Sequence, residues 1–195
     1  MLILLVVSGL CRAQYSNHQL YQAYLSQDVT IWGEYIASAK WDSMTIDDRK
    51  QLLNYEYGYT AVVLGGDKEQ AKAMLQRYEQ HLQALKDILP QARYEAYMAS
   101  VYTYKMALEK NRLIHHAKNL FACVNRIKAL DTKDAFALSM LGNVEFYAPT
   151  GSKKQALEYF QQADSVYSIQ AEEYEKWNHQ AVKITIEQCS EKLKK

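Results

Sequence analysis

Histidine side chains are the first groups in this chain that could carry acid-base or metal chemistry. His115 and His116 are adjacent, whereas His18, His81 and His179 are isolated in the sequence. Neighbouring residues on a helix point about 100° apart, so the pair cannot hold one metal ion without ligands from elsewhere. We therefore expect solvated or hydrogen-bonded histidines. A metal-dependent helical-bundle enzyme using His115 or His116 is the weakest of three functional hypotheses.

Carboxylates and sequence motifs give no further support for catalysis. The acidic pairs 47–48 and 172–173 fall in the first turns of predicted helices, where negative charge stabilises the helix dipole. The sequence contains no glycine-rich phosphate loop, nucleophile elbow, Cys-x2-Cys pair or His-Glu-x2-His motif. We expect no enzyme and no cofactor.

The composition predicts one largely helical domain. The 195 residues include only seven glycines and two prolines, and long amphipathic stretches separate them. The formal net charge is +1, and basic residues alternate with acidic ones, so the chain lacks the basic patch of a nucleic-acid-binding protein. The charged end at 191–195 is expected to be a solvated helix end.

Apolar residues at helical spacing and capping signals locate the elements. Thr45 with Asp48 resembles a capping box, the pair 65–66 is a glycine stop, Asp67 caps the next helix, and Pro90 ends it. The predicted helical segments are 17–26, 29–40, 45–65, 67–89, 91–111, 113–130, two helices over 134–168, and 170–195. The joint near Asn111 lacks a strong breaker, so one long bent helix over 91–130 is an alternative.

Three of these segments, 67–89, 113–130 and the second helix of 134–168, each have an alanine near the start that is followed four residues later by a large apolar residue. The pairs are Ala71/Leu75, Ala117/Phe121 and Ala156/Phe160. Small residues allow the backbones of a helical hairpin to approach, and large ones fill the gaps between turns. The middle segment is predicted to turn one stripe inward, made of Ile114, Ala117, Phe121, Val124 and Ile127.

The third copy is the most complete. Leu138, the pair Leu141-Gly142 and then Ala156 with Phe160 follow in an order that resembles the tetratricopeptide repeat (TPR). It departs from that pattern at Glu145, where an aromatic residue is expected, at Thr132, which replaces a proline, and in a longer loop over 148–152.

The resemblance implies an all-α, α-α superhelix of about three degenerate TPR-like hairpins in a single domain over 14–195. The repeats would span about 45–89, 91–131 and 134–168, with flanking N-terminal helices and a capping helix over 170–195. An irregular α-helical bundle is the alternative. Both predict an all-α fold.

Residues 1–13 resemble a signal peptide. An apolar stretch ends in Cys11-x-Ala13, with small residues where a signal peptidase cleaves, and cleavage before Gln14 would export the chain to the periplasm or the exterior. The stretch is shorter than the roughly 20 residues that span a bilayer. A short signal ending in Ala-Gln before a tyrosine-rich chain is similar to exported proteins of the Bacteroidetes group. Acylation at Cys11, a buried N-terminal segment and a true start upstream of Met1 are alternatives.

Two cysteines would remain in the mature chain. Cys123 and Cys189 could pair in an oxidising compartment. Each lies on an apolar helical face, which favours a small buried hydrophobic residue over a disulfide.

Tyrosine is the residue type that points to binding. Sixteen occur, with clusters at Tyr55, Tyr57 and Tyr59 and at Tyr94, Tyr97, Tyr102 and Tyr104. Tyrosine combines contact area with a hydroxyl, which suits a binding groove, although it also packs between helices. The TPR resemblance implies that the first helix of each hairpin lines a concave surface. The expected groove residues are Asn54, Tyr55, Tyr59, Tyr102 and Asn143.

The first hypothesis is thus a non-catalytic protein-protein interaction module in the periplasm or cell envelope, with another protein or peptide as its partner. We expect no nucleic-acid partner, and the membrane only by proximity. The alternative is a small-molecule-binding helical protein with a tyrosine-lined pocket.

Overall fold

The structure, a computed structural model, describes residues 15–194. Within this range the chain forms nine α-helices, three short 3-10 turns and no strand, which confirms the all-α prediction. The helices are α1 (Asn17–Leu25), α2 (Thr30–Ser38), α3 (Ile46–Val63), α4 (Lys68–Ala84), α5 (Gln91–Leu108), α6 (Leu113–Ala129), α7 (Ala135–Tyr147), α8 (Lys153–Gln170) and α9 (Lys176–Leu193). The 3-10 turns are η1 (Trp41–Ser43), η2 (Lys110–Arg112) and η3 (Glu173–Glu175).

The predicted signal peptide over 1–13, its cleavage before Gln14 and acylation at Cys11 lie outside the described residues. Among the helices that the structure describes, none has the length and apolar character required to cross a membrane.

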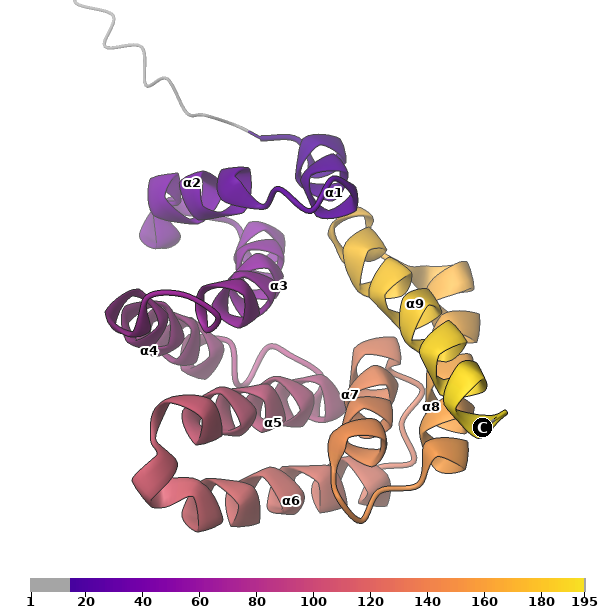
Figure 1. Ribbon diagram of the computed structural model, residues 1–195. Coiled ribbons are helices and arrows are strands. Elements are labelled where there is room, and N and C mark those ends of the chain that lie inside the picture. Colours follow the sequence, from indigo (N-terminus) through magenta and orange to yellow (C-terminus); the bar gives the residue numbers. More distant parts are fainter. Residues whose placement is uncertain (1–14, 195) are drawn as a thin grey trace, which may run out of the picture.

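Consecutive helices pack against one another around an arc. The pairs α3/α4, α5/α6 and α7/α8 are in contact, α3 and α7 each also contact α5, and α9 packs on α8. In Figure 1 the chain follows this arc from α1 to α9, and the beginning of α9 returns to α1, with which it is in contact. The last helix therefore joins the two ends of the helical series.

Local signals define most helix ends. The Thr45 side chain accepts a hydrogen bond from the Asp48 amide, and the Asp48 side chain accepts one from the Thr45 amide, which confirms the capping box. Asp67 caps α4 through the amides of residues 69 and 70. The chain between α5 and α6 breaks at Glu109 and forms η2, so the long bent helix is not what the chain adopts.

Two ends differ from expectation. Helix α4 ends at Ala84, and the chain between it and Pro90 forms turns where helix was predicted. The predicted C-terminal helix over 170–195 is divided, because α8 runs to Gln170 and η3 precedes α9.

Small residues lie at the closest contacts of the hairpins. Ala71 and Ala156 are completely buried, and Phe160 is 1% exposed. A Cβ atom on Gly142 would lie 2.8 Å from Phe160 Cε1, which is closer than carbon atoms pack. The hairpin α7/α8 therefore depends on glycine at this position.

The buried face of α6 differs from the predicted one. Ile114 is 86% exposed and Phe121 is 44% exposed, so both point away from the core. The buried residues of α6 are His116, Leu120, Cys123, Val124 and Ile127. Leu120, Val124 and Ile127 form a stripe at helical spacing, and burying it turns the Ala117/Phe121 pair outward. The prediction of an inward Ile114 and Phe121 was wrong.

The N-terminal helices pack on α3 and α9 through aromatic rings. Trp32 and Ile36 of α2 are each 1% exposed. The rings of Trp32 and Trp177 lie 5.1 Å apart. A Cβ atom on Gly58 would lie 2.7 Å from Trp32 and 2.8 Å from Trp177, so the glycine allows both indoles to pack against α3.

Candidate functional site

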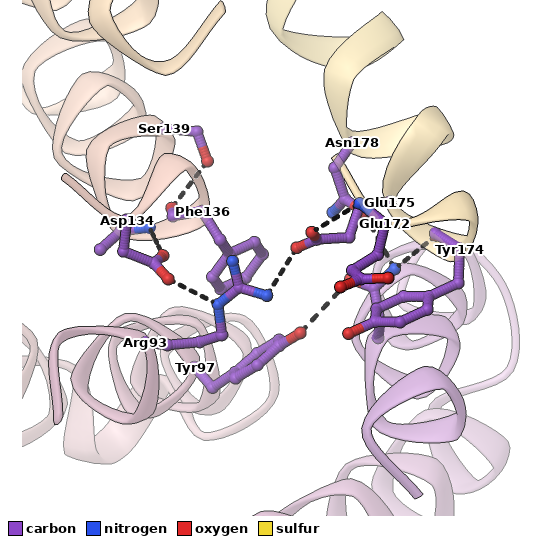
Figure 2. A network of polar contacts seen from close by, with 11 residues as sticks. Arg93, Tyr97, Asp134, Phe136, Ser139, Glu172, Tyr174, Glu175 and Asn178 are labelled. Carbon is purple, nitrogen blue, oxygen red and sulfur yellow. Dashed lines mark hydrogen bonds and ion pairs between the residues drawn. The ribbon is translucent and has the colours of Figure 1, made fainter. Parts of the chain in front are cut away.

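A buried polar network joins the first helices of the three hairpins to the C-terminal segment (Figure 2). Arg93 Nε donates to Asp134 Oδ2 at 2.7 Å, and Arg93 Nη1 donates to Glu175 Oε1 at 2.6 Å. The side chains of Arg93, Asp134 and Glu175 are 16%, 13% and 4% exposed. One guanidinium thus joins two carboxylates, and these belong to elements far apart in the sequence.

The ends of helices position these three groups. Arg93 lies in the first turn of α5, which follows the N-cap residue Pro90. Asp134 is the N-cap of α7, and its Oδ1 accepts from the Ala137 amide at 2.8 Å. Glu175 closes the η3 turn immediately before α9. Asp134 and Glu175 therefore each have a local capping contact beside the long-range contact to Arg93.

Burial and neighbouring charge shift the proton affinities of the network. Burial raises the pKa of Glu175, and the Asp134 charge adds to this, whereas Arg93 opposes it. Burial alone would lower the pKa of Arg93, but the two carboxylates outweigh it and raise that pKa. The guanidinium therefore stays charged and stabilises both carboxylates.

Asn54 extends the network to the C-terminal segment. Its Nδ2 donates to the Tyr174 backbone carbonyl at 3.0 Å and to Asn178 Oδ1 at 2.9 Å. The Tyr97 hydroxyl donates to Asn54 Oδ1 at 3.3 Å. Residues 174–178 therefore cover Asn54, one of the predicted groove residues on α3.

Two predicted groove residues are consequently not on an outward surface. Asn54 and Tyr55 are both 0% exposed. Asn54 binds the C-terminal segment, and the Tyr55 ring packs against Trp32 and Tyr35 with centroid distances of 5.0 and 5.5 Å. The expectation that they face a partner is corrected, because contacts within the chain use both side chains.

The other three predicted residues are partly exposed and lie in different surroundings. Tyr59 faces α2, where its hydroxyl lies close to Gly33. The Tyr102 ring stacks 6.4 Å from His116 of α6. Asn143 lines a hollow of about 50 Å³ together with Trp177. The structure therefore does not bring the five residues together in one groove.

A hollow of about 220 Å³ lies beside the polar network. Its lining includes Arg93, Glu175 and two tyrosines, Tyr97 and Tyr174. A neighbouring hollow of about 280 Å³ shares Tyr174 with it and is otherwise lined mainly by acidic and amide side chains. Small polar molecules would fit these dimensions, and Tyr97 and Tyr174 are the tyrosines that a pocket here would use.

A second buried ion cluster joins α3 to α4. Glu56 is completely buried, and it accepts from Arg77 Nε at 2.7 Å and lies 2.9 Å from His81 Nδ1. The His81 ring stacks on Trp41 at 3.8 Å. These contacts connect η1, α3 and α4, so the charges stabilise the first hairpin.

The remaining histidines are consistent with the expectation of solvated or hydrogen-bonded rings. His116 Nε2 lies 2.9 Å from Glu109, and His179 Nε2 lies 2.7 Å from Asp164. The two exposed histidines are His18 and His115. Over residues 15–194, no three His, Cys, Asp or Glu side chains are grouped so that they could hold a metal ion.

Cys123 and Cys189 are both free and buried. Cys123 packs in the core between α5 and α6, and Cys189 packs in a separate core with α7 and α8. The structure thus agrees with the prediction of small buried hydrophobic residues.

The sequence reasoning missed Glu56, Arg93 and Glu175. A signal was available for Glu56, which lies between two tyrosines, whereas Arg93 and Glu175 lie in stretches with other charged residues and give no such signal. A charge at such a position requires a buried partner.

Comparison with known proteins gives no relative: no family model, curated protein or solved structure matches this chain.

Proposed function

We propose that this chain is a TPR-like helical-repeat module that binds another protein in the periplasm or cell envelope and carries out no catalysis. The observation that carries the proposal is that the buried polar groups bind neighbouring helices to one another. Glu56 links α3 to α4, Arg93 links α5 to α7 and η3, and Asn54 links α3 to α9. Because these groups hold helices together, we assign function to surfaces and not to an interior reaction centre.

Two features of the packing support the repeat interpretation. The pairs α3/α4 and α7/α8 approach closely at small residues, which are Ala71 in the first and Gly142 and Ala156 in the second. The first helices α3, α5 and α7 contact one another in series, as stacked hairpins require. The location rests on the signal-peptide resemblance of residues 1–13.

In this proposal a partner uses side chains that remain accessible. The C-terminal segment covers Asn54, whereas Tyr59, Tyr102 and Asn143 retain partial exposure. Tyr59 and Tyr102 provide aromatic area with a hydroxyl, which favours protein contacts at low entropic cost.

The test uses residues 14–195 coupled to a resin and an envelope extract of the source organism. Each retained protein is then purified and titrated against the free chain by calorimetry. We expect at least one partner with saturable binding, and weaker binding to the variant Tyr59→Ala/Tyr102→Ala. The control is Tyr147→Ala, which alters a 70% exposed tyrosine outside the predicted set. Failure of every retained protein to show saturable binding contradicts the proposal.

The second candidate function is binding of a small molecule in the hollow of about 220 Å³. The observation that favours it is the combination of Tyr97, Tyr174 and the charged network in its wall. Native mass spectrometry of the purified protein tests it. A co-purified small molecule that is lost in Tyr174→Ala, but retained in Tyr147→Ala, supports this function, and an unliganded mass in both weighs against it.

A further inference from the structure

The solvent face of α6 differs from those of the equivalent second helices, α4 and α8. The exposed residues of α4 include no large apolar side chain. Those of α8 include one, Ile169, which lies in the last turn of that helix. At the equivalent face of α6, Ile114 is 86% exposed and Phe121 is 44% exposed. Large apolar residues exposed on a helix that has already buried another face indicate a contact surface.

The exposed residues of α6 form one continuous stripe. Ile114, Lys118, Phe121, Asn125 and Lys128 are all exposed and follow at spacings of four, three, four and three residues. This spacing places them on one side of a helix, over a length of about 20 Å at 1.5 Å per residue. We call these five residues the α6 stripe. Its length and its spacing of three and four residues match the contact face of a second helix.

The charge of the stripe is positive. Helix α6 contains Lys118, Arg126 and Lys128 and no acidic residue. Arg126 pairs with Glu95 at 2.7 Å, and Lys128 pairs with Glu145 at 3.0 Å. Among the described residues, Lys118 forms no ion pair, so its ammonium group next to Ile114 and Phe121 is available to a partner.

We propose that the α6 stripe docks an amphipathic, acidic helix of a protein partner. Its apolar residues would contact Ile114 and Phe121, and a carboxylate would pair with Lys118. This inference rests on the proposed protein-binding function and names the surface and the partner chemistry.

Charge and apolar area decide between this occupant and two others. A second copy of α6 would offer no carboxylate to Lys118, because this helix contains no acidic residue. Attachment to a lipid surface requires a broad apolar face, whereas the stripe offers two large apolar side chains among polar ones. An acidic helix satisfies both the apolar and the charged positions.

The experiment uses a designed probe. A fluorescent peptide of about 18 residues carries leucines at the i, i+4, i+7 and i+11 positions with glutamates beside them, and a second peptide scrambles the same composition. Fluorescence anisotropy is measured with the full chain at low salt. The main variant is Ile114→Ser/Phe121→Ser, and its control is Ile169→Ser, which removes an 82% exposed isoleucine from α8. For charge, Lys118→Glu is compared with Lys154→Glu, which alters an exposed lysine of α8.

We expect saturable binding of the amphipathic peptide and none of the scrambled peptide. The Ile114→Ser/Phe121→Ser variant should weaken binding at least about tenfold, because two apolar contacts are lost. Lys118→Glu should weaken peptide binding more at low salt than at high salt. The two α8 controls should bind like the unaltered chain. We expect every variant to remain folded, because all altered side chains are exposed. Circular dichroism checks this.

Equal binding to the stripe variants and the controls overturns the proposal, as does absence of binding to the unaltered chain. Anionic vesicles that bind through Ile114 and Phe121 while the peptide does not would assign the stripe to a lipid surface. A dimer seen by sedimentation that the same variant abolishes would assign it to self-association. A natural partner that binds Ile114→Ser/Phe121→Ser unchanged overturns the stripe alone and leaves the protein-binding function intact.

Discussion

The contact between Gly142 and Phe160 gives a stability prediction that can be worked from the structure. In Gly142→Ala the new Cβ would lie 2.8 Å from Phe160 Cε1 and 2.9 Å from Cδ1 and Cζ. An ordinary contact begins at 3.4 Å, so the ring or the helix must move by about 0.6 Å, the difference between 3.4 and 2.8 Å. Phe160 is 1% exposed and is enclosed by core residues, so this movement disturbs the packing of α7 against α8.

Two opposing effects set the magnitude. Overpacking in a well-packed core costs about 1–3 kcal/mol. Alanine in place of glycine inside a helix stabilises it by about 1 kcal/mol. The net effect of Gly142→Ala is therefore a loss of about 1 kcal/mol in the free energy of unfolding, with the larger cost assigned to the collision.

Gly33→Ala is the matched control, because it also changes a glycine inside a helix. Its Cβ would lie 2.5 Å from the Tyr59 hydroxyl and 2.8 Å from the ring carbon Cζ, both at the far end of a partly exposed side chain. That ring can turn toward solvent, so the gain in helix propensity should dominate. We expect Gly33→Ala to be the more stable variant by about 2 kcal/mol.

Urea unfolding followed by circular dichroism measures both variants. The same comparison in a Phe160→Leu background provides a coupling energy, because the smaller side chain removes the collision. If Gly142→Ala is as stable as Gly33→Ala, or if its cost is unchanged in the Phe160→Leu background, the close-contact explanation fails.

Three further predictions concern buried polar groups. Arg93→Met leaves two buried carboxylates without a cation, so the free energy of unfolding should fall by about 3–5 kcal/mol near neutral pH. The loss should be smaller in acid, because Glu175 then gains a proton. Urea titrations at two pH values measure both effects. Burial raises the pKa of Cys123 to about 12, so Ellman's reagent should modify it only as urea unfolds the protein. Burial also raises the pKa of Tyr57 to about 12, while an unfolded tyrosine ionises near about 10; the folded state then retains more protons, and stability should fall as pH rises above about 10.

Each of these has a contradicting result. Arg93→Met at unaltered stability would mean that the two carboxylates are solvated. Rapid modification of Cys123 in the native protein would mean that the core around it opens. If the tyrosinate absorbance shows that every tyrosine ionises near pH 10 while the helix content is unchanged, the burial of Tyr57 is contradicted.

The starts of α3, α4 and α5 were predictable because their signals are local. Thr45 and Asp48 form reciprocal hydrogen bonds within one turn, and Asp67 caps amides two and three residues later. Pro90 fixes the start of α5 in the same way. None of these contacts depends on another helix, so the sequence alone is sufficient to place them.

The buried face of α6 was harder to predict because two apolar stripes compete on the same helix. The predicted stripe combined Ile114 and Phe121 with Val124 and Ile127, whereas the structure buries Val124 and Ile127 together with Leu120. Periodicity alone cannot choose between them, since both have helical spacing. In the structure the second stripe packs on α5, where His116 can also reach Glu109.

The polar network was beyond local reasoning for a different reason. Arg93 meets Glu175 across 82 positions in sequence, and Asn54 meets Asn178 across 124. Such pairs depend on where α9 lies relative to α3 and α5, which helix periodicity does not specify. The sequence could indicate that a charge within an apolar stretch needs a partner, but not which residue provides it.

The return of the C-terminal segment connects these observations with the choice of binding surface. Trp177 packs against Trp32 and over Gly58, and Asn54 holds the backbone beside it, so residues 174–178 are part of the core of this fold. Removing them from α3 would expose buried aromatic surface and leave Asn54 without its partners, which costs free energy in both respects. A partner that binds the folded chain therefore gains more from surfaces that need no rearrangement. Among the second helices, α6 offers such a surface at Ile114 and Phe121, which is why the proposed contact is placed on the outside of the arc.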